Sequence, residues 1–154
     1  MKDRTTHGAA DGRREAVAPR RTARFGRAEA LRLLGTVSLG RIVFTQQALP
    51  AVRPVNHLID GEDVIVQLHD GATLASLVTP ANTAGVVVAY EADAIDPETH
   101  TGWSVMVTGY AHRVTDEREL ARFTARLRPW TEHPAVNAAL RIRPDLVTGL
   151  RLTA

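Results

Sequence analysis

Short turns separate most of the strand-like segments in this 154-residue sequence. Runs that alternate in polarity or are rich in β-branched residues predict about six strands, at residues 39–45, 49–59, 64–68, 86–91, 103–114 and 140–152. Such short connections join antiparallel neighbours, because a parallel pair needs a crossover of a dozen or more residues. The pattern therefore predicts a mostly β fold, an antiparallel β-barrel with a few helices.

Two helices are expected beside these strands. Residues 27–34 favour a short helix, because they are rich in alanine, leucine and arginine. A later helix should begin at Thr115 or Asp116, which are good N-cap residues followed by acids, and should end near Pro129. Pro144 is expected to interrupt the last strand.

Charge is distributed unevenly along the chain. Residues 1–27 hold eight Lys or Arg against three acids, and residues 28–154 hold eleven Arg against fourteen acids. Residues 1–24 lack periodicity, so we expect a disordered basic leader followed by one domain over residues 25–154. The mildly acidic body argues against a nucleic-acid partner.

Several classes of protein are excluded or disfavoured. The absence of cysteine excludes disulfides and Cys-based metal sites, and it is compatible with a cytoplasmic location. No apolar run approaches the roughly 18 residues of a membrane helix, so no membrane association is expected. Gly-rich nucleotide loops are absent. The six histidines lack ligand spacing, so no metal site is predicted, and His57 and His69 are interpreted as half-exposed strand residues. Catalytic residues stay unassigned, because no acid, base or nucleophile stands out.

The segment from Leu49 to Asn56, LPAVRPVN, carries an unusual polar cluster for a strand. Arg53 and Pro54 stand side by side, and the segment ends in the carboxamide of Asn56. A buried structural strand has no need of these groups. We therefore interpret this strand as one wall of a ligand site.

Several short motifs, taken in order, resemble one family. They are Arg53-Pro54-Val55-Asn56, Asp70-Gly71, Gly102-Trp103-Ser104-Val105 with Val107-Thr108-Gly109, Arg141-Ile142 and Val147-Thr148-Gly149. This set is similar to the pyridoxamine 5′-phosphate oxidase-like, FMN-binding split-barrel proteins, over roughly residues 27–152. The resemblance implies a split β-barrel that forms a homodimer and binds FMN in two clefts at the dimer interface.

The same resemblance implies the residues that contact the cofactor. The flavin ring is expected along Arg53, Pro54, Val55 and Asn56. Trp103 and Ser104 are expected at the interface, reaching the flavin of the other subunit. A flavin needs a flat apolar slot with a few fixed donors and acceptors, which these residue types can supply.

The phosphate-binding part of the family pattern is altered in this chain. Gln67 stands where the family has an arginine, Leu68 where it has a hydroxyl residue, and Thr73 where it has a lysine, within Gly71-Ala-Thr-Leu74. Losing a charge-assisted partner of a phosphate costs roughly 1.5–3 kcal/mol. Two hypotheses stay open. The protein is an FMN-dependent oxidoreductase of unknown small-molecule substrate, or it is a non-catalytic split-barrel dimer that binds flavin, a deazaflavin or another ligand.

Overall fold

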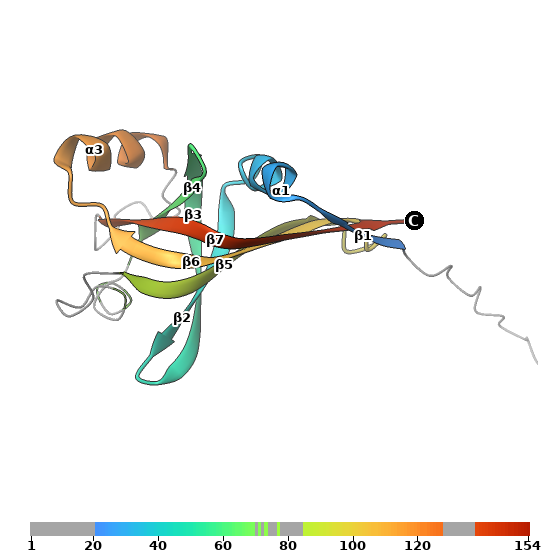
Figure 1. Cartoon of the computed structure of the whole chain (residues 1–154), viewed down its shortest axis with the longest axis horizontal. Helices are drawn as coiled ribbons and strands as arrows, with labels where there is room; N and C mark the ends of the chain where they lie inside the picture. The colour runs from blue at the N-terminus through green and yellow to red at the C-terminus, as the bar shows by residue number, and fades with distance from the viewer. Residues whose placement is uncertain (1–20, 70, 72, 74–76, 78–84, 128–137) are drawn as a thin grey trace, which may run out of the picture.

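The computed structural model describes residues 21–69, 71, 73, 77, 85–127 and 138–154 of the chain (Figure 1). Within these ranges the chain forms one seven-stranded sheet accompanied by helices. The elements, in chain order, are β1 (Arg21–Phe25), α1 (Arg27–Leu34), β2 (Leu39–Gln46), β3 (Leu49–Asp60), β4 (Asp63–Leu68), β5 (Val86–Ile95), β6 (Gly102–Arg113), α3 (Glu117–Arg126) and β7 (Ala138–Thr153).

The sheet closes into a barrel. Its strand order is β1-β7-β4-β3-β2-β5-β6. Because β6 also pairs with β7, the six strands from β7 to β6 form a closed ring. Every pairing is antiparallel. This confirms the predicted antiparallel barrel. β1 lies outside the closed ring and extends it along the end of β7 (Figure 1).

All six predicted strands are present, and the structure differs from the expectation at three places. β5 continues to Ile95, which pairs with Gly102, because the β5–β6 ladder runs beyond the β-branched segment. β1 begins at Arg21, inside the segment expected to be irregular through residue 24, because β7 offers it a free edge. Residues 1–20 lie outside the described part. At Pro144 the strand continues, with a register shift opposite Gly109 in place of a break.

The apolar core fills the barrel and extends to α1. Successive side chains of a strand point to opposite faces, so one face of each strand contributes to the core inside the barrel. Leu31 and Leu34 of α1 belong to the same core cluster. A second cluster lies between α3 and the outer side of β4 and β7. Its buried members are Ile65, Val114, Phe123, Leu127 and Ala139.

Polar contacts hold α3 in place. Asp116 caps its first turn by accepting a hydrogen bond from the Glu119 N–H at 2.8 Å, as predicted. Arg141 on β7 donates to Asp60 at 3.2 Å, to Asp63 at 2.8 Å and to Glu119. These contacts tie the helix to the β3–β4 hairpin. No helix in the described part of the chain is long and apolar enough to cross a membrane.

Candidate functional site

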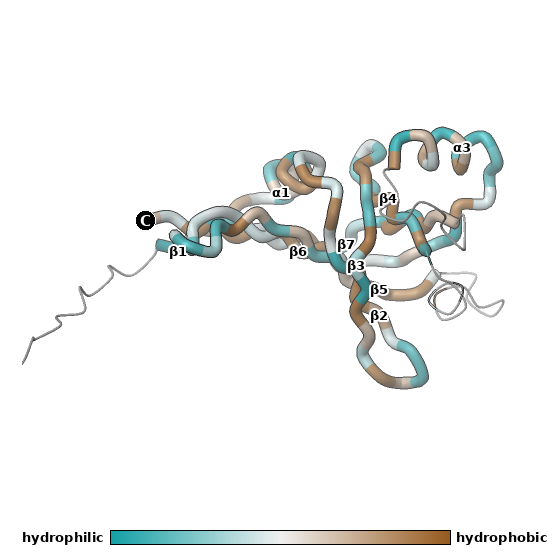
Figure 2. Tube along the Cα trace, turned by 180° about the vertical axis from the view of Figure 1, so that it is seen from behind, coloured by the Kyte–Doolittle hydropathy of each residue, from teal (hydrophilic) through white to brown (hydrophobic). Residues whose placement is uncertain are grey.

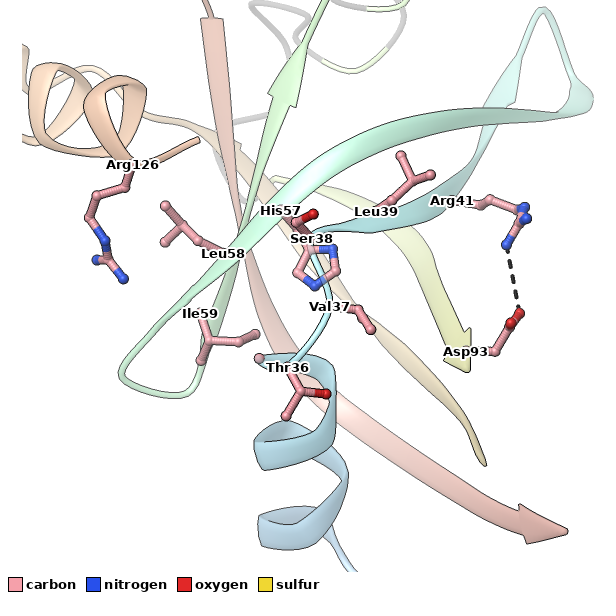
Figure 3. A pocket seen from close by; sticks show the side chains of 11 residues that line it. Thr36, Val37, Ser38, Leu39, Arg41, His57, Leu58, Ile59, Asp93 and Arg126 are labelled. Carbon is pink, nitrogen blue, oxygen red and sulfur yellow. Dashed lines mark ion pairs between the residues drawn. The ribbon is translucent and has the colours of Figure 1, made fainter. Parts of the chain in front are cut away.

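An open cavity of about 690 Å³ lies where β3 changes its partner strand. β3 pairs with β2 up to Asn56 and with β4 from His57 onward. The connection from α1 to β2 contacts β3 at this point, where the His57 N–H donates to the Ser38 carbonyl at 2.9 Å. Figure 3 shows the residues that line the cavity: Gly35, Thr36, Val37, Ser38, Leu39, Arg41, His57, Leu58, Ile59, Asp93 and Arg126.

The rim of this cavity carries charge of both signs. Arg41 lies 3.3 Å from Glu91 and 3.7 Å from Asp93, and the second pair is drawn in Figure 3. Burial and the neighbouring Asp93 carboxylate raise the pKa of Glu91. Arg126, at the end of α3, has no ion-pair partner among the residues that the structure describes. One side of the rim therefore holds the Arg41–Asp93 ion pair, and the other holds the cationic Arg126.

His57 is buried, which corrects its interpretation as a half-exposed strand histidine. Its Nε2 contacts the Leu34 carbonyl at 2.8 Å, and its Nδ1 contacts the Tyr90 hydroxyl. Burial lowers the pKa of His57, and its backbone contacts oppose that effect only in part. The imidazole is thus a neutral, fixed part of the cavity wall.

The predicted ring wall is divided between the two sides of β3. Arg53 donates to the Val52 carbonyl at 2.9 Å, and its guanidinium lies 5.8 Å from the centre of the Phe44 ring. Val55 faces the core. Pro54 and Asn56 lie on the opposite side, where Pro54 is exposed and Asn56 is 5% exposed. The Nδ2 of Asn56 has no hydrogen-bond partner among the described residues.

The predicted phosphate positions are enclosed. Gln67, Leu68 and Thr73 are 2%, 1% and 1% exposed. The Leu68 side chain belongs to the barrel core, and its assignment to a ligand site stays a prediction. Within the part of the chain that the structure describes, the Oε1 of Gln67 has no hydrogen-bond partner. Gly71 is exposed, and Leu74 lies outside the described residues.

Trp103 and Ser104 lie on opposite sides of β6. Trp103 packs in the barrel core and is 8% exposed, and its expected contact at a dimer interface stays a prediction. Ser104 lines a second cavity of about 430 Å³, together with Arg24, Phe25, Met106, Val147, Thr148, Gly149 and Leu150. Ser104 and Trp103 therefore have different surroundings, and neither lines the first cavity.

Sequence reasoning missed the residues that join β3 to the first cavity. His57, Leu39 and Arg126 come from three elements, and only His57 is next to the predicted motif in the sequence, whereas Leu39 pairs with Asn56 across the sheet. Its position directly after Asn56 was the available signal. Among the described residues, no group of three or more His, Asp or Glu could hold a metal ion.

The closed antiparallel barrel, with β3 changing partner beside an open cavity, defines a split-barrel protein. Residues 26–151 match the family described as pyridoxamine 5′-phosphate oxidase, and the chain belongs to that family. The resemblance inferred from the motifs is thereby confirmed.

Three proteins illustrate the relationship. The uncharacterized protein Rv0080 of Mycobacterium tuberculosis is 47% identical over 135 residues, which is 88% of each chain. The FAD-binding protein of Mycobacterium smegmatis is 26% identical, with a TM-score of 0.63 over 85% of this chain and 98% of that one. An FAD-binding protein of Mesorhizobium loti has a TM-score of 0.73 at 17% identity, over 88% and 100% of the chains, and shows the fold alone.

Proposed function

We propose that this protein is a flavin-dependent oxidoreductase that binds the flavin ring beside β3 and acts on a small-molecule substrate. Membership of the family supports the proposal, as does a relative that is itself described as FAD-binding. The observation that carries it is the buried, unpartnered Nδ2 of Asn56, next to residues that line an open cavity. A buried donor without a partner costs free energy unless a ligand satisfies it.

The residues present fit the ring system of a flavin better than they fit its phosphate. The Asn56 amide can donate to a ring carbonyl, and Leu39 and Leu58 can cover apolar ring surface. When bound, the flavin supplies hydride and electron transfer. The protein residues then bind the ring, orient it and exclude water. A cytoplasmic location remains part of this proposal.

A visible absorption spectrum of the purified protein, before and after FMN is added, tests the proposal. We expect flavin bands that comigrate with the protein in gel filtration. Reduction of the bound flavin by NADPH, followed by reoxidation with candidate substrates, tests catalysis. A protein that stays colourless with excess FMN would contradict flavin binding.

A second candidate function is non-catalytic binding of a flavin, a deazaflavin or another ligand. The enclosed side chains of Gln67, Leu68 and Thr73 support this alternative. They differ from the phosphate-binding residues that the family resemblance implies, and such a change is compatible with a carrier or a sensor. A protein that binds flavin tightly and whose flavin NADPH does not reduce would support this alternative over the oxidoreductase.

We also propose that the protein is a homodimer. The outer side of β5, β6 and β7 exposes large apolar side chains that neighbour one another in register: Val87 (56% exposed), Met106 (48%), Tyr110 (45%), Leu146 (67%) and Leu150 (37%). A contiguous patch of this kind marks an interaction surface. A second copy is the occupant we favour, because Ser104, a predicted cofactor contact, lies on the same side of β6.

A further inference from the structure

Three enclosed side chains occupy the positions where the family pattern holds the phosphate. Gln67 and Thr73 are buried, and Leu68 packs in the barrel core with Val66 and Leu140. Enclosed side chains of this kind offer no charged group to an incoming anion. A phosphate dianion brought here would lose its hydration without gaining an ion pair.

The charge of this part of the chain opposes an anion as well. From Pro54 to His112 the sequence contains no lysine or arginine. Over the same stretch it carries eight acidic residues, Asp60, Glu62, Asp63, Asp70, Glu91, Asp93, Asp96 and Glu98. β4, β5, the last part of β3 and almost all of β6 come from this stretch, and Arg41 of β2 is paired with Glu91 and Asp93, so these strands contribute more negative than positive charge.

Two amide atoms without a hydrogen-bond partner among the described residues, Nδ2 of Asn56 and Oε1 of Gln67, also disfavour a phosphate. The Oε1 of Gln67 is an acceptor, and it requires a donor that a phosphate dianion cannot supply. Asn56 and Gln67 flank the His57–Val66 pair and so lie on the same side of the sheet. Each carboxamide has one donor group and one acceptor atom, so the two side chains together can satisfy a neutral partner that both donates and accepts. The pair suits neutral polar groups.

We propose that this protein binds its flavin through the ring system and does not recognise the 5′-phosphate, so that riboflavin binds about as tightly as FMN. The inference rests on the proposed function, since it concerns the same ligand. It names a cofactor preference that follows from this chain's own residues at positions 67, 68 and 73.

Titration of flavin fluorescence with the full-length protein tests this, with riboflavin and FMN measured side by side at low and at high salt. We expect dissociation constants within about threefold of each other, with little change on adding salt, because no ion pair to the phosphate is formed. An FMN affinity higher by about tenfold or more, weakened by salt, would overturn the inference and leave flavin binding intact. If neither flavin binds, the proposed function fails and this inference fails with it.

Two variants make the test sharper. Arg126 and Arg24 are the cations beside the two cavities that have no ion-pair partner within the described residues. We expect Arg126→Gln and Arg24→Gln to leave the ratio of FMN to riboflavin affinity unchanged. A selective loss of FMN binding in either variant would place the phosphate at that arginine and overturn the inference. Exposed Arg118→Gln on α3 is the matched control, because it removes the same charge away from both cavities.

Discussion

His57 and Tyr90 form a polar pair inside an apolar barrel. The Tyr90 hydroxyl donates to Nδ1 of His57, and His57 donates from Nε2 to the Leu34 carbonyl at 2.8 Å. Both ring nitrogens of a neutral imidazole are thereby used, one as acceptor and one as donor. Burial lowers the pKa of His57 and raises that of Tyr90. The neutral pair joins the end of α1 to β3 and β5.

This pair predicts a loss of stability in mild acid. The unfolded chain takes up a proton on His57 near pH 6.5, and the folded protein does so only at lower pH. The free energy of unfolding should therefore fall as the pH drops below about 6.5, by at most about 1.4 kcal/mol per pH unit. Urea titrations at about pH 7.5 and about pH 5.5 measure this loss.

His57→Gln should show a smaller loss between the two pH values than the wild type. Exposed His112→Gln is the control and should behave as the wild type does. The raised pKa of Glu91 acts in the opposite direction and is common to all three proteins, so their differences report on His57. An unchanged pH dependence in His57→Gln would refute the assignment.

Gly40 is required by the same pair. A Cβ at this position would lie 2.3 Å from the Tyr90 hydroxyl oxygen and 2.6 Å from the Glu91 carbonyl oxygen. We predict that Gly40→Ala lowers the free energy of unfolding by about 1–3 kcal/mol, measured by denaturant titration. Gly26→Ala, where a Cβ meets nothing within 4 Å, should change it by less than about 0.5 kcal/mol.

At the scale of elements, the β2–β3 hairpin projects from the barrel on the side away from the helices (Figure 1). Its turn places Gln47 and Ala48 at φ values of 51° and 62°, which glycine and asparagine adopt more easily. In Figure 2 apolar and polar segments alternate along this hairpin, whereas α3 is largely hydrophilic. The hairpin thus combines a strained turn with exposed Leu49 and Val52.

Relief of that strain should stabilise the protein. We predict that Ala48→Gly raises the free energy of unfolding by about 0.5–1 kcal/mol, because glycine adopts a positive φ without a steric cost. Ala51→Gly, in β3 of the same hairpin, should lower it by a similar amount, since glycine weakens a strand interior. Thermal and denaturant unfolding report both. Equal signs for the two substitutions would contradict the role assigned to the turn.

At the scale of the whole molecule, closure of the barrel decides which surfaces remain free. β6 pairs with β5 at one edge and with β7 at the other, so its backbone hydrogen bonds are made within the barrel. The side chains on its outer face remain exposed to solvent. The apolar patch from Val87 to Leu150 lies there. Dimerisation would bury this patch and bring Ser104 to a second chain.

Leu146→Lys tests that arrangement. We predict that a lysine in the patch raises the dimer dissociation constant at least about tenfold, about 1.4 kcal/mol, because a charge is then desolvated at the interface. Sedimentation velocity over a concentration series measures it. Leu49→Lys is the control, because Leu49 is as exposed, at 68% against 67%, and lies at the hairpin tip. A wild-type protein that stays monomeric would refute the homodimer.

Local pattern was sufficient for the strands, for α1 and for the Asp116 cap, because these depend on residues close together in the chain. It was insufficient for β1, whose partner β7 lies at the other end of the sequence. Of the candidate site, the β3 motif could be predicted from the sequence, and it immediately precedes His57, which lines a cavity. His57 and Arg126 were not found, because they come together only when α1, β3 and α3 are packed.

The antiparallel class, the family and the absence of the family's cationic side chains at Gln67 and Thr73 could all be read from the amino-acid sequence. Only the tertiary structure decided that Trp103 faces the core and Ser104 the outside, and that Leu68 is interior. Alternation states that neighbouring side chains point to opposite sides of a strand. Which side becomes the inside is settled when β6 and β7 close the barrel, and that pairing depends on contacts far apart in the chain.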